Sequence, residues 1–271
     1  MMTSEIYNDL NGINGLSGLD NLNEQWAIIY VMIAVFLLLM LLLVAKAILL
    51  FPKNIRKHSI LKYAYSGIQL QGSKDFQTEH FDVLSSERSL FAVIVSGNID
   101  TKPGISIAKL AVETLKNEYS HEPYNPDKME EFFAKSIKKA HKTVADNGFE
   151  HNTPPSIIVV VIENKFLNIA EAHGSLRSNS VYLFRDKRLI EITNRKTISS
   201  VQVSKIKLTG DEIIMMASKG LTTSLDEADI IRCLSGVAHP RWRCQRTETI
   251  IKQKYLKEQD NVTVVIMEQM P

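Results

Sequence analysis

The residues that could carry out chemistry stand in three short segments, in each of which an apolar run adjoins polar residues. The segments are Leu90–Gly97, Leu208–Leu221 and Asp260–Ile266. No glycine-rich phosphate loop, zinc-ligand spacing or Ser-His-Asp order accompanies them. The seven histidines, at positions 58, 80, 121, 141, 151, 173 and 239, have no metal-ligand spacing either. The sequence thus indicates neither zinc nor serine-hydrolase chemistry.

Short strand-like runs surround these segments. The expected strands are residues 90–95, 156–162, 165–170, 180–185, 188–193, 212–217 and 261–266. Glu163-Asn164 and Asp186-Lys187 are short enough for hairpin turns, so neighbouring strands should pair antiparallel.

Apolar residues at helical spacing predict helices between the strands. A stripe from Met129 to Val144 follows Asn125-Pro126, a cap and a first-turn proline. A further helix is indicated around residues 107–115, and Ser224 with Glu227 forms a capping box for one ending at Leu234. Residues 246–258 predict the last helix. This order predicts an α+β sandwich of two antiparallel β-sheets flanked by α-helices.

Together the three segments resemble the metal-dependent protein serine/threonine phosphatases of the protein phosphatase 2C class. The family's first segment reads Phe-Ala-Val-x-x-Asp-Gly-x-Gly-Gly. Its second is Gly-Asp, an apolar strand and Ser-Asp-Gly, and its third is Asp-Asn-x-Thr-Val. The resemblance spans roughly residues 66–268, in family order. It implies two stacked antiparallel sheets flanked by helix pairs, in agreement with the elements above.

The resemblance also implies where two Mg²⁺ or Mn²⁺ ions would bind, and most of these positions lack the family's residue. Ser96 and Lys219 each stand where the family has a ligating Asp. Glu79 replaces a metal-binding Asp, and only Asp260 is unchanged. The degenerate former metal-site positions are Glu79, Ser96, Gly97, Lys219, Asp260 and Asn261.

Electrostatics argues against metal at such a site. At about 4 Å and an effective dielectric of about 20, a lysine beside a divalent ion costs roughly 8 kcal/mol before relaxation. We therefore expect no metal cofactor and no catalytic residues, and an internal ion pair of Lys219 with Asp260 and Glu79 instead. Lys74 is a weak match for the family's phosphate-binding Arg, and residues 172–180 lack the Asp of the family's Gly-Asp-Ser-Arg turn.

A membrane anchor is expected before this domain. Residues 26–45 carry no charge and would form a helix about 30 Å long, the thickness of the hydrocarbon core. Trp26 fits an interfacial aromatic belt, Lys46 can extend towards the headgroups, and the apolar run continues to Phe51. A secretory signal peptide would need a basic start, yet residues 1–25 contain no Lys or Arg. A buried core helix is the other alternative.

The basic residues that follow the anchor predict its orientation. They are Lys46, Lys53, Arg56, Lys57 and Lys62. By the positive-inside rule, residues 1–25 form an extracytoplasmic tail, 26–51 the transmembrane helix and 52–65 a basic linker. Residues 66–271 form a cytoplasmic domain. This places a single-pass protein in the cell membrane, the inner one in a Gram-negative bacterium, and Cys233 and Cys244 should be reduced.

The sequence thus predicts a membrane-anchored pseudophosphatase that serves as a scaffold or regulatory subunit. Its expected partner is a protein at the membrane: a phosphoprotein, a kinase, or a component of a secretion or envelope machine. Arg241, Trp242 and Arg243 are best explained as part of a solvated loop, and a contact patch for the partner is the alternative. The net charge of +2 argues against a nucleic-acid partner.

Two alternatives remain open at this point. In one, Glu79 and Asp260 hold a single metal in a weakly active phosphatase. In the other, the former metal cleft binds an anion beside Lys219.

Overall fold

A computed structural model describes most of the chain, in two compact units that comprise Met1–Ser59 and Ile60–Pro271. The described residues are 16–50, 62–87, 89–121, 126–149, 154–173, 179–193, 201–236, 238–254 and 256–270.

The first unit contains one helix, α1 (Leu16–Leu50). Its described side chains include large apolar ones that are exposed, such as Ile28, Phe36 and Leu41. Among the residues whose side chains are described, no helix has the length and apolar composition needed to cross a membrane. The predicted anchor falls partly outside those residues, since the side chains of Ala27, Val44, Ala45 and residues 47–51 are not among them. Most of the predicted tail and linker also lie outside the described residues.

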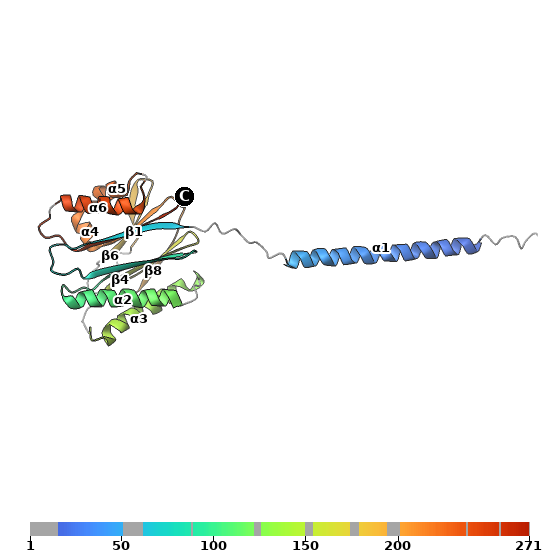
Figure 1. Cartoon of the computed structure of the whole chain (residues 1–271), viewed down its shortest axis with the longest axis horizontal. Helices are drawn as coiled ribbons and strands as arrows, with labels where there is room; N and C mark the ends of the chain where they lie inside the picture. The colour runs from blue at the N-terminus through green and yellow to red at the C-terminus, as the bar shows by residue number, and fades with distance from the viewer. Residues whose placement is uncertain are drawn as a thin grey trace, which may run out of the picture. The chain divides into compact units, whose positions relative to one another are not determined.

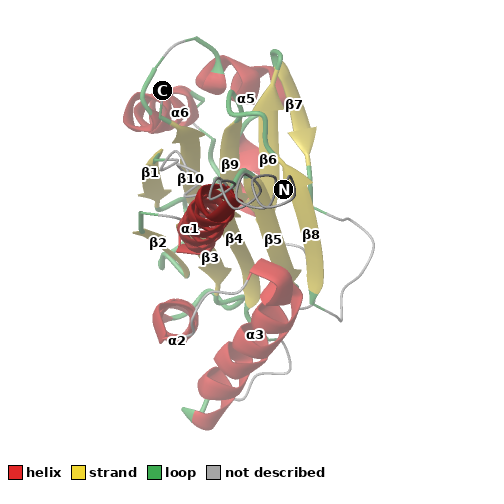
Figure 2. Cartoon of the chain, turned by 90° about the vertical axis from the view of Figure 1, so that its right-hand side faces the viewer, coloured by secondary structure: helices red, strands yellow, loops and turns green. Residues whose placement is uncertain are grey.

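The second unit is built on two five-stranded antiparallel sheets, whose strand orders can be followed in Figure 2. The first sheet is ordered β1 (Tyr63–Leu70), β10 (Val262–Gln269), β9 (Ile213–Ser218), β6 (Asn179–Arg185) and β7 (Arg188–Glu191). The second is ordered β2 (Glu79–Ser85), β3 (Ser89–Ser96), β4 (Ser156–Glu163), β5 (Phe166–Ala172) and β8 (Gln202–Lys207). This confirms the predicted sandwich.

Helices cover the outer face of each sheet, which gives four layers (Figure 1). Helices α2 (Lys102–His121) and α3 (Met129–Asp146), with the 3₁₀ turn Pro126–Lys128, lie on the second sheet. Helices α4 (Lys219–Ser224), α5 (Glu227–Leu234) and α6 (Pro240–Gln253) lie on the first.

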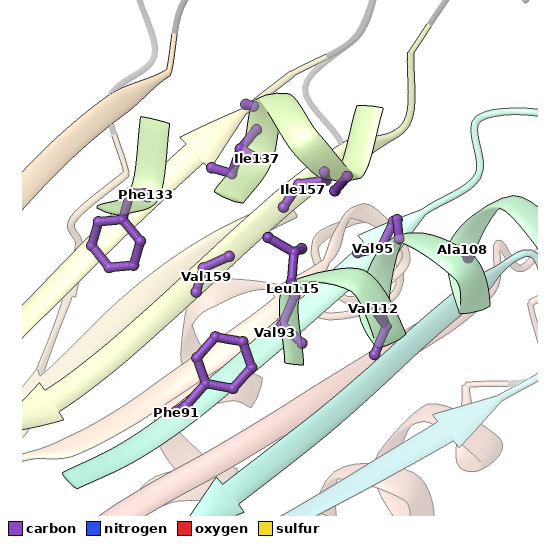
Figure 3. Close-up of a cluster of buried hydrophobic side chains, with 14 of the residues drawn as sticks. Phe91, Val93, Val95, Ala108, Val112, Leu115, Phe133, Ile137, Ile157 and Val159 are labelled. Carbon is purple, nitrogen blue, oxygen red and sulfur yellow. The ribbon is translucent and has the colours of Figure 1, made fainter. Parts of the chain in front are cut away.

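Each interface between layers has its own apolar core. Alternate residues of β3 and β4, such as Val93 and Val159, point to α2 and α3 and meet Leu115 and Phe133 (Figure 3). The intervening residues of these strands point to the first sheet and form the core between the sheets. The third core lies between the first sheet and α4–α6. Strands buried on both faces explain why β3 and β4 are continuous apolar runs in the sequence.

Several predicted boundaries are wrong, for local reasons. The predicted capping box fails because Asp226, not Ser224, caps α5, accepting from the backbone N–H of Asp229 at 2.8 Å. Ser224 instead ends α4 and donates to the carbonyl of Gly220. The last helix begins at Pro240, six residues earlier than predicted, because His239 caps it and Pro240 occupies its first turn.

Candidate functional site: a polar layer at one end of the sandwich

Polar residues close the inter-sheet core at one end. On β3 the inward-facing series Leu90, Ala92 and Ile94 continues to Ser96, and on β4 the series Ile158, Val160 and Ile162 begins at Ser156. The same alternation holds for the other central strands. The buried polar members of this layer are Glu79, Ser96, Ser156, Glu171, Asn179, Ser218 and Thr263.

Strand register brings this layer together from distant parts of the sequence. Ser96 pairs with Glu79 on one side and with Ser156 on the other. In the opposite sheet Asn179 pairs with Ser218. The Asn179 side-chain amide donates to the carbonyl of Ser156 at 3.3 Å, which joins the two sheets at this end.

Glu79 is the buried acid of the layer, with 8% of its surface exposed. Burial of this carboxyl raises its pKa to about 7. Among the described residues, its Oε2 atom has no hydrogen-bond partner, and neither do Asn179 Oδ1 and Thr263 Oγ1. The layer therefore contains polar atoms whose hydrogen-bonding capacity is unused.

Asp260 is engaged by a lysine, but not by the one expected. Lys74 Nζ lies 2.8 Å from Asp260 Oδ1. Burial alone would lower the pKa of Lys74, but the hydrogen bond and the charges of Asp260, Asp100 and Glu79 raise it. Lys219, the first residue of α4, is exposed, and no described carboxylate pairs with it. The predicted pairing of Lys219 with Asp260 and Glu79 is therefore wrong, because Lys74 from the β1–β2 loop reaches Asp260.

Asn261 fixes the loop that carries Lys74. Its side-chain amide donates to the carbonyl of Phe76 at 2.6 Å and accepts from the backbone N–H of Gly72 at 3.1 Å. Two glycines allow the close backbone approach: a Cβ at Gly72 would lie 2.0 Å from the carbonyl oxygen of Gln259, and one at Gly220 would lie 1.8 Å from that of Asn261. The β1–β2 loop, the start of β10 and the start of α4 are thus packed backbone to backbone.

Gly97 has a packing role as well. Its N–H donates to the carbonyl of Thr78 at 2.9 Å, next to Glu79. A Cβ at Gly97 would lie 2.2 Å from the carbonyl oxygen of Gly104, near the start of α2. Gly97 therefore lets α2 approach the end of β3.

These residues do not fit a two-metal centre. Mg²⁺ and Mn²⁺ prefer oxygen ligands, and two such ions bring four positive charges that carboxylates of the site must neutralise. Of the four predicted ligand positions, Ser96 and Lys219 supply no carboxylate, and Asp260 is paired with a cation. Among the described residues, no group of three or more His, Cys, Asp or Glu side chains is placed to hold a metal ion.

The predicted contact patch lies elsewhere and is not a loop. Arg241, Trp242 and Arg243 belong to the first turn of α6. Trp242 is 61% exposed, whereas Arg243 is 4% exposed and pairs with Glu268 near the end of β10, away from Asp260 at its start. Only Arg241 and Trp242 are therefore available to a partner at the surface.

The sequence analysis does not single out Glu171 and Glu212, although both acids are buried. Glu171 accepts from His173 at 2.8 Å at the end of β5, with both side chains buried. Glu212 accepts from the backbone N–H groups of Thr209 and Gly210 and pairs with Arg185. The alternation Leu167, Ile169, Glu171 carries a signal for the first, because it places Glu171 on the inner face.

No protein-family model matches the chain, and no curated protein matches it in sequence. Solved structures do match its fold. The serine/threonine phosphatase Stp1 from Staphylococcus aureus superposes with a TM-score of 0.67 at 14% identity, covering 81% of this chain and 99% of that one. The fold is that of the protein phosphatase 2C class.

Two further phosphatase structures agree. The S. agalactiae serine/threonine phosphatase has a TM-score of 0.66 at 12% identity, covering 76% of this chain and 99% of that one. The catalytic domain of the phosphatase PstP, solved with two manganese ions, has a TM-score of 0.63 at 14% identity and covers 77% of this chain and 99% of that one. The protein phosphatase 2C-like fold therefore extends over the second unit.

Proposed function

We propose that this protein is a membrane-anchored pseudophosphatase, whose phosphatase 2C-like domain binds a protein partner instead of hydrolysing phosphate esters. The observation that carries the proposal is the Lys74–Asp260 ion pair. In it, a side-chain ammonium group pairs with Asp260, the one unchanged ligand position of the resemblance, and it also interacts electrostatically with Asp100 and Glu79. A divalent ion at Asp260 would have to displace Lys74 or share the carboxylate with it.

The substituted positions support the same function. Ser96 and Lys219 stand where the family has two aspartates, so a neutral and a cationic side chain replace two carboxylates. The site therefore lacks negative charge that two divalent ions require. The domain nevertheless keeps a complete protein phosphatase 2C-like fold. A retained fold does not imply the activity of its class, because activity depends on the residues at the site. The partner we infer is a phosphoprotein, a kinase or another component of a membrane assembly.

Membrane attachment rests on the sequence of α1. Its central residues, 26–45, are uncharged, and its described large apolar side chains are exposed. The basic residues that follow favour a cytoplasmic domain. The test is an alkaline carbonate wash of membranes carrying the full chain, with a variant lacking residues 26–51 as control. The full chain should remain in the membrane pellet, and its release into the supernatant would contradict anchoring.

A weakly active phosphatase is the competing function. The Oε2 atom of buried Glu79 has no hydrogen-bond partner in the described part of the chain. This favours the enzyme, because a single ion held by Glu79 and Asp260 would satisfy that atom. Hydrolysis of p-nitrophenyl phosphate in Mn²⁺ separates the two functions. We expect no turnover above that of an Asp260→Asn variant. Wild-type turnover that disappears in Asp260→Asn would establish the enzyme and reject the pseudophosphatase.

A further inference from the structure

Exposed apolar side chains gather at the end of the second unit where the chain enters β1. Among the described residues of this unit, five large apolar side chains are exposed, and three of them lie around the start of β1. Tyr65 belongs to the first turnless stretch of that strand, and Met270 donates its backbone N–H to the carbonyl of Lys62 at 2.8 Å. The largest of the three is Trp242, which is 61% exposed. Such a grouping of exposed apolar side chains indicates an interaction surface.

The first turn of α6 holds Trp242 at this end. The neighbouring Arg243 points inward, and its Nε lies 3.4 Å from Oε2 of Glu268. Glu268 is paired with Ala64, the second residue of β1, in the antiparallel register of β1 and β10. Trp242 belongs to the exposed face of the helix, whose inner face is part of the apolar core against the first sheet. The indole is therefore held in solvent beside the start of β1 by a helix that is itself fixed.

Unpaired cations accompany Trp242 on the exposed face of α6. Arg241 precedes it, and Arg246 follows it by four residues, which is one helical turn further on. Arg246 donates to a carbonyl at the end of α5, and neither arginine pairs with a carboxylate in the described part of the chain. The exposed residues of α6 include no acid, because Glu248 is half-buried and pairs with Lys252. Trp242 is thus surrounded on its own helix by positive charge.

Carboxylates on the neighbouring elements do not cancel this charge. Asp229 of α5 and Glu268 of β10 are each paired with basic residues. Asp186 and Asp211 line a pocket beside the start of α6, and the two basic residues that follow Asp186 in the sequence carry the opposite charge. An anionic surface is therefore the partner that the charges at this end of the domain favour.

The proposed anchor keeps this same end close to a bilayer. Twelve residues, 51–62, join the end of α1 to the start of β1, and a chain of that length spans at most about 40 Å. Four of them are basic, which favours an anionic leaflet over a neutral one. We propose that Trp242, with Arg241 and Arg246, docks this end of the domain on the anionic lipid surface of the membrane. The inference rests on the membrane attachment proposed above.

The chemistry of each group fits this partner. An indole is favoured at the depth of the lipid headgroups, because its ring is apolar and its N–H is polar. The two guanidinium groups contact lipid phosphates through charge-assisted hydrogen bonds. Docking also sets the direction of the domain: β10 extends from Gln269 at this end to Val262 beside the polar layer, roughly 25 Å away. The Lys74–Asp260 pair therefore lies on the side that a protein partner can reach.

The two tryptophans of the chain report the anchor and the docking separately. Trp26 lies in the proposed anchor, so Trp26→Phe leaves Trp242 as the only indole, and Trp242→Phe leaves Trp26. Each full-length variant is reconstituted in vesicles in which half of the lipid is phosphatidylcholine brominated near the headgroup end of its acyl chains. Bromine quenches only indoles that lie within the lipid. The other half of the lipid is phosphatidylglycerol or, for comparison, unbrominated phosphatidylcholine.

We expect bromine to reduce Trp242 emission about twofold in the phosphatidylglycerol vesicles and much less in phosphatidylcholine alone. Trp26 should be quenched in both. Quenched Trp26 with unquenched Trp242 overturns the docking and leaves the anchor standing, as expected for a Trp242 that is reserved for a protein partner. Unquenched Trp26 overturns the anchor and, with it, the docking.

A pair of matched variants tests the role of charge in the Trp26→Phe protein. Arg241→Gln should reduce the quenching of Trp242 in phosphatidylglycerol vesicles, and high salt should do the same. Lys138→Gln is the control, since Lys138 is an exposed cation of α3, which covers the other sheet. It should leave the quenching unchanged. Quenching that responds neither to Arg241→Gln nor to salt contradicts docking on an anionic surface, and so does an equal loss in both variants.

Discussion

Lys74 and Asp260 are 186 residues apart in sequence, and their Nζ and Oδ1 atoms lie 2.8 Å apart. The pair joins the β1–β2 loop to the start of β10, where Asn261 already binds that loop through Phe76 and Gly72. The cation that neutralises Asp260 is thus part of the chain itself. This relationship connects the fold to the proposed loss of metal chemistry.

The Lys74–Asp260 pair should contribute little to stability. Its side chains are 41% and 29% exposed, and partly exposed pairs contribute about 0.2–1 kcal/mol. A double-mutant cycle with Lys74→Met and Asp260→Asn, measured by urea unfolding, should give a coupling energy in that range. The same cycle with Lys219→Met is the control and should give none. A larger coupling for Lys219 than for Lys74 would contradict the observed pairing.

Glu79 should make stability fall as pH rises. The folded-state pKa of about 7 lies above the ordinary value of 4.5. The stability contributed by protonated Glu79 is therefore complete below about pH 4.5 and is lost as pH rises through 7. Glu79→Gln should raise the free energy of unfolding at pH 8 by up to about 3 kcal/mol and change it little at pH 4.5. Equal effects of Glu79→Gln at the two pH values would refute this assignment.

Gly220 should be intolerant of a side chain. A Cβ there would lie 1.8 Å from the carbonyl oxygen of Asn261, which is backbone and cannot move alone. Gly220→Ala should destabilise the domain by about 1–3 kcal/mol in thermal or urea unfolding. Thr222→Ala, an exposed position of the same helix, should stay within about 0.5 kcal/mol of wild type. A tolerated Gly220→Ala would show that these segments are not tightly packed.

Glu212 should contribute stability that acid removes. Burial alone would raise the pKa of its carboxyl, but hydrogen bonds from Thr209 and Gly210 lower it to about 2. The contribution is present above about pH 4.5 and is lost as pH falls towards 2. Glu212→Gln should cost about 1–3 kcal/mol at pH 7 and little at pH 2, whereas Asp211→Asn on the exposed neighbour should cost less than about 0.5 kcal/mol. A destabilisation by Glu212→Gln that is the same at pH 7 and pH 2 would contradict the lowered pKa of Glu212.

The central strands could be predicted because their residues are apolar on both faces. The apolar runs that contain Val93 and Val159 extend over whole strands. A similar apolar run predicts β10. Edge strands carry a weaker signal. Strand β8, with Lys205 and Lys207 among its residues, has only partly buried and exposed positions and was missed. Strands β1 and β2 were missed as well, since polar residues such as Ser66 and His80 interrupt their apolar pattern.

The sequence predicts which residues lie at the site, but it does not predict which of them contact one another. Motif order identified Glu79 and Asp260, which both lie at the end of the sandwich that carries the polar layer. The ion pair depends on the path of the β1–β2 loop. The close packing of Gly72 and its hydrogen bond with the Asn261 side chain determine that path, and these two residues lie near opposite ends of the domain's sequence. Such long-range backbone contacts leave no local pattern in the sequence. The sequence alone therefore favours Lys219 over Lys74 as the partner of Asp260.

The most direct test of the proposed function is a calorimetric titration of Mn²⁺ into the full-length protein. We expect no saturable binding at millimolar Mn²⁺, because Lys74 engages Asp260 and the positions of Ser96 and Lys219 supply no carboxylate. Stoichiometric Mn²⁺ binding by the wild-type protein that is absent in the Asp260→Asn variant would contradict the pseudophosphatase proposal. It would favour a metal-dependent enzyme instead.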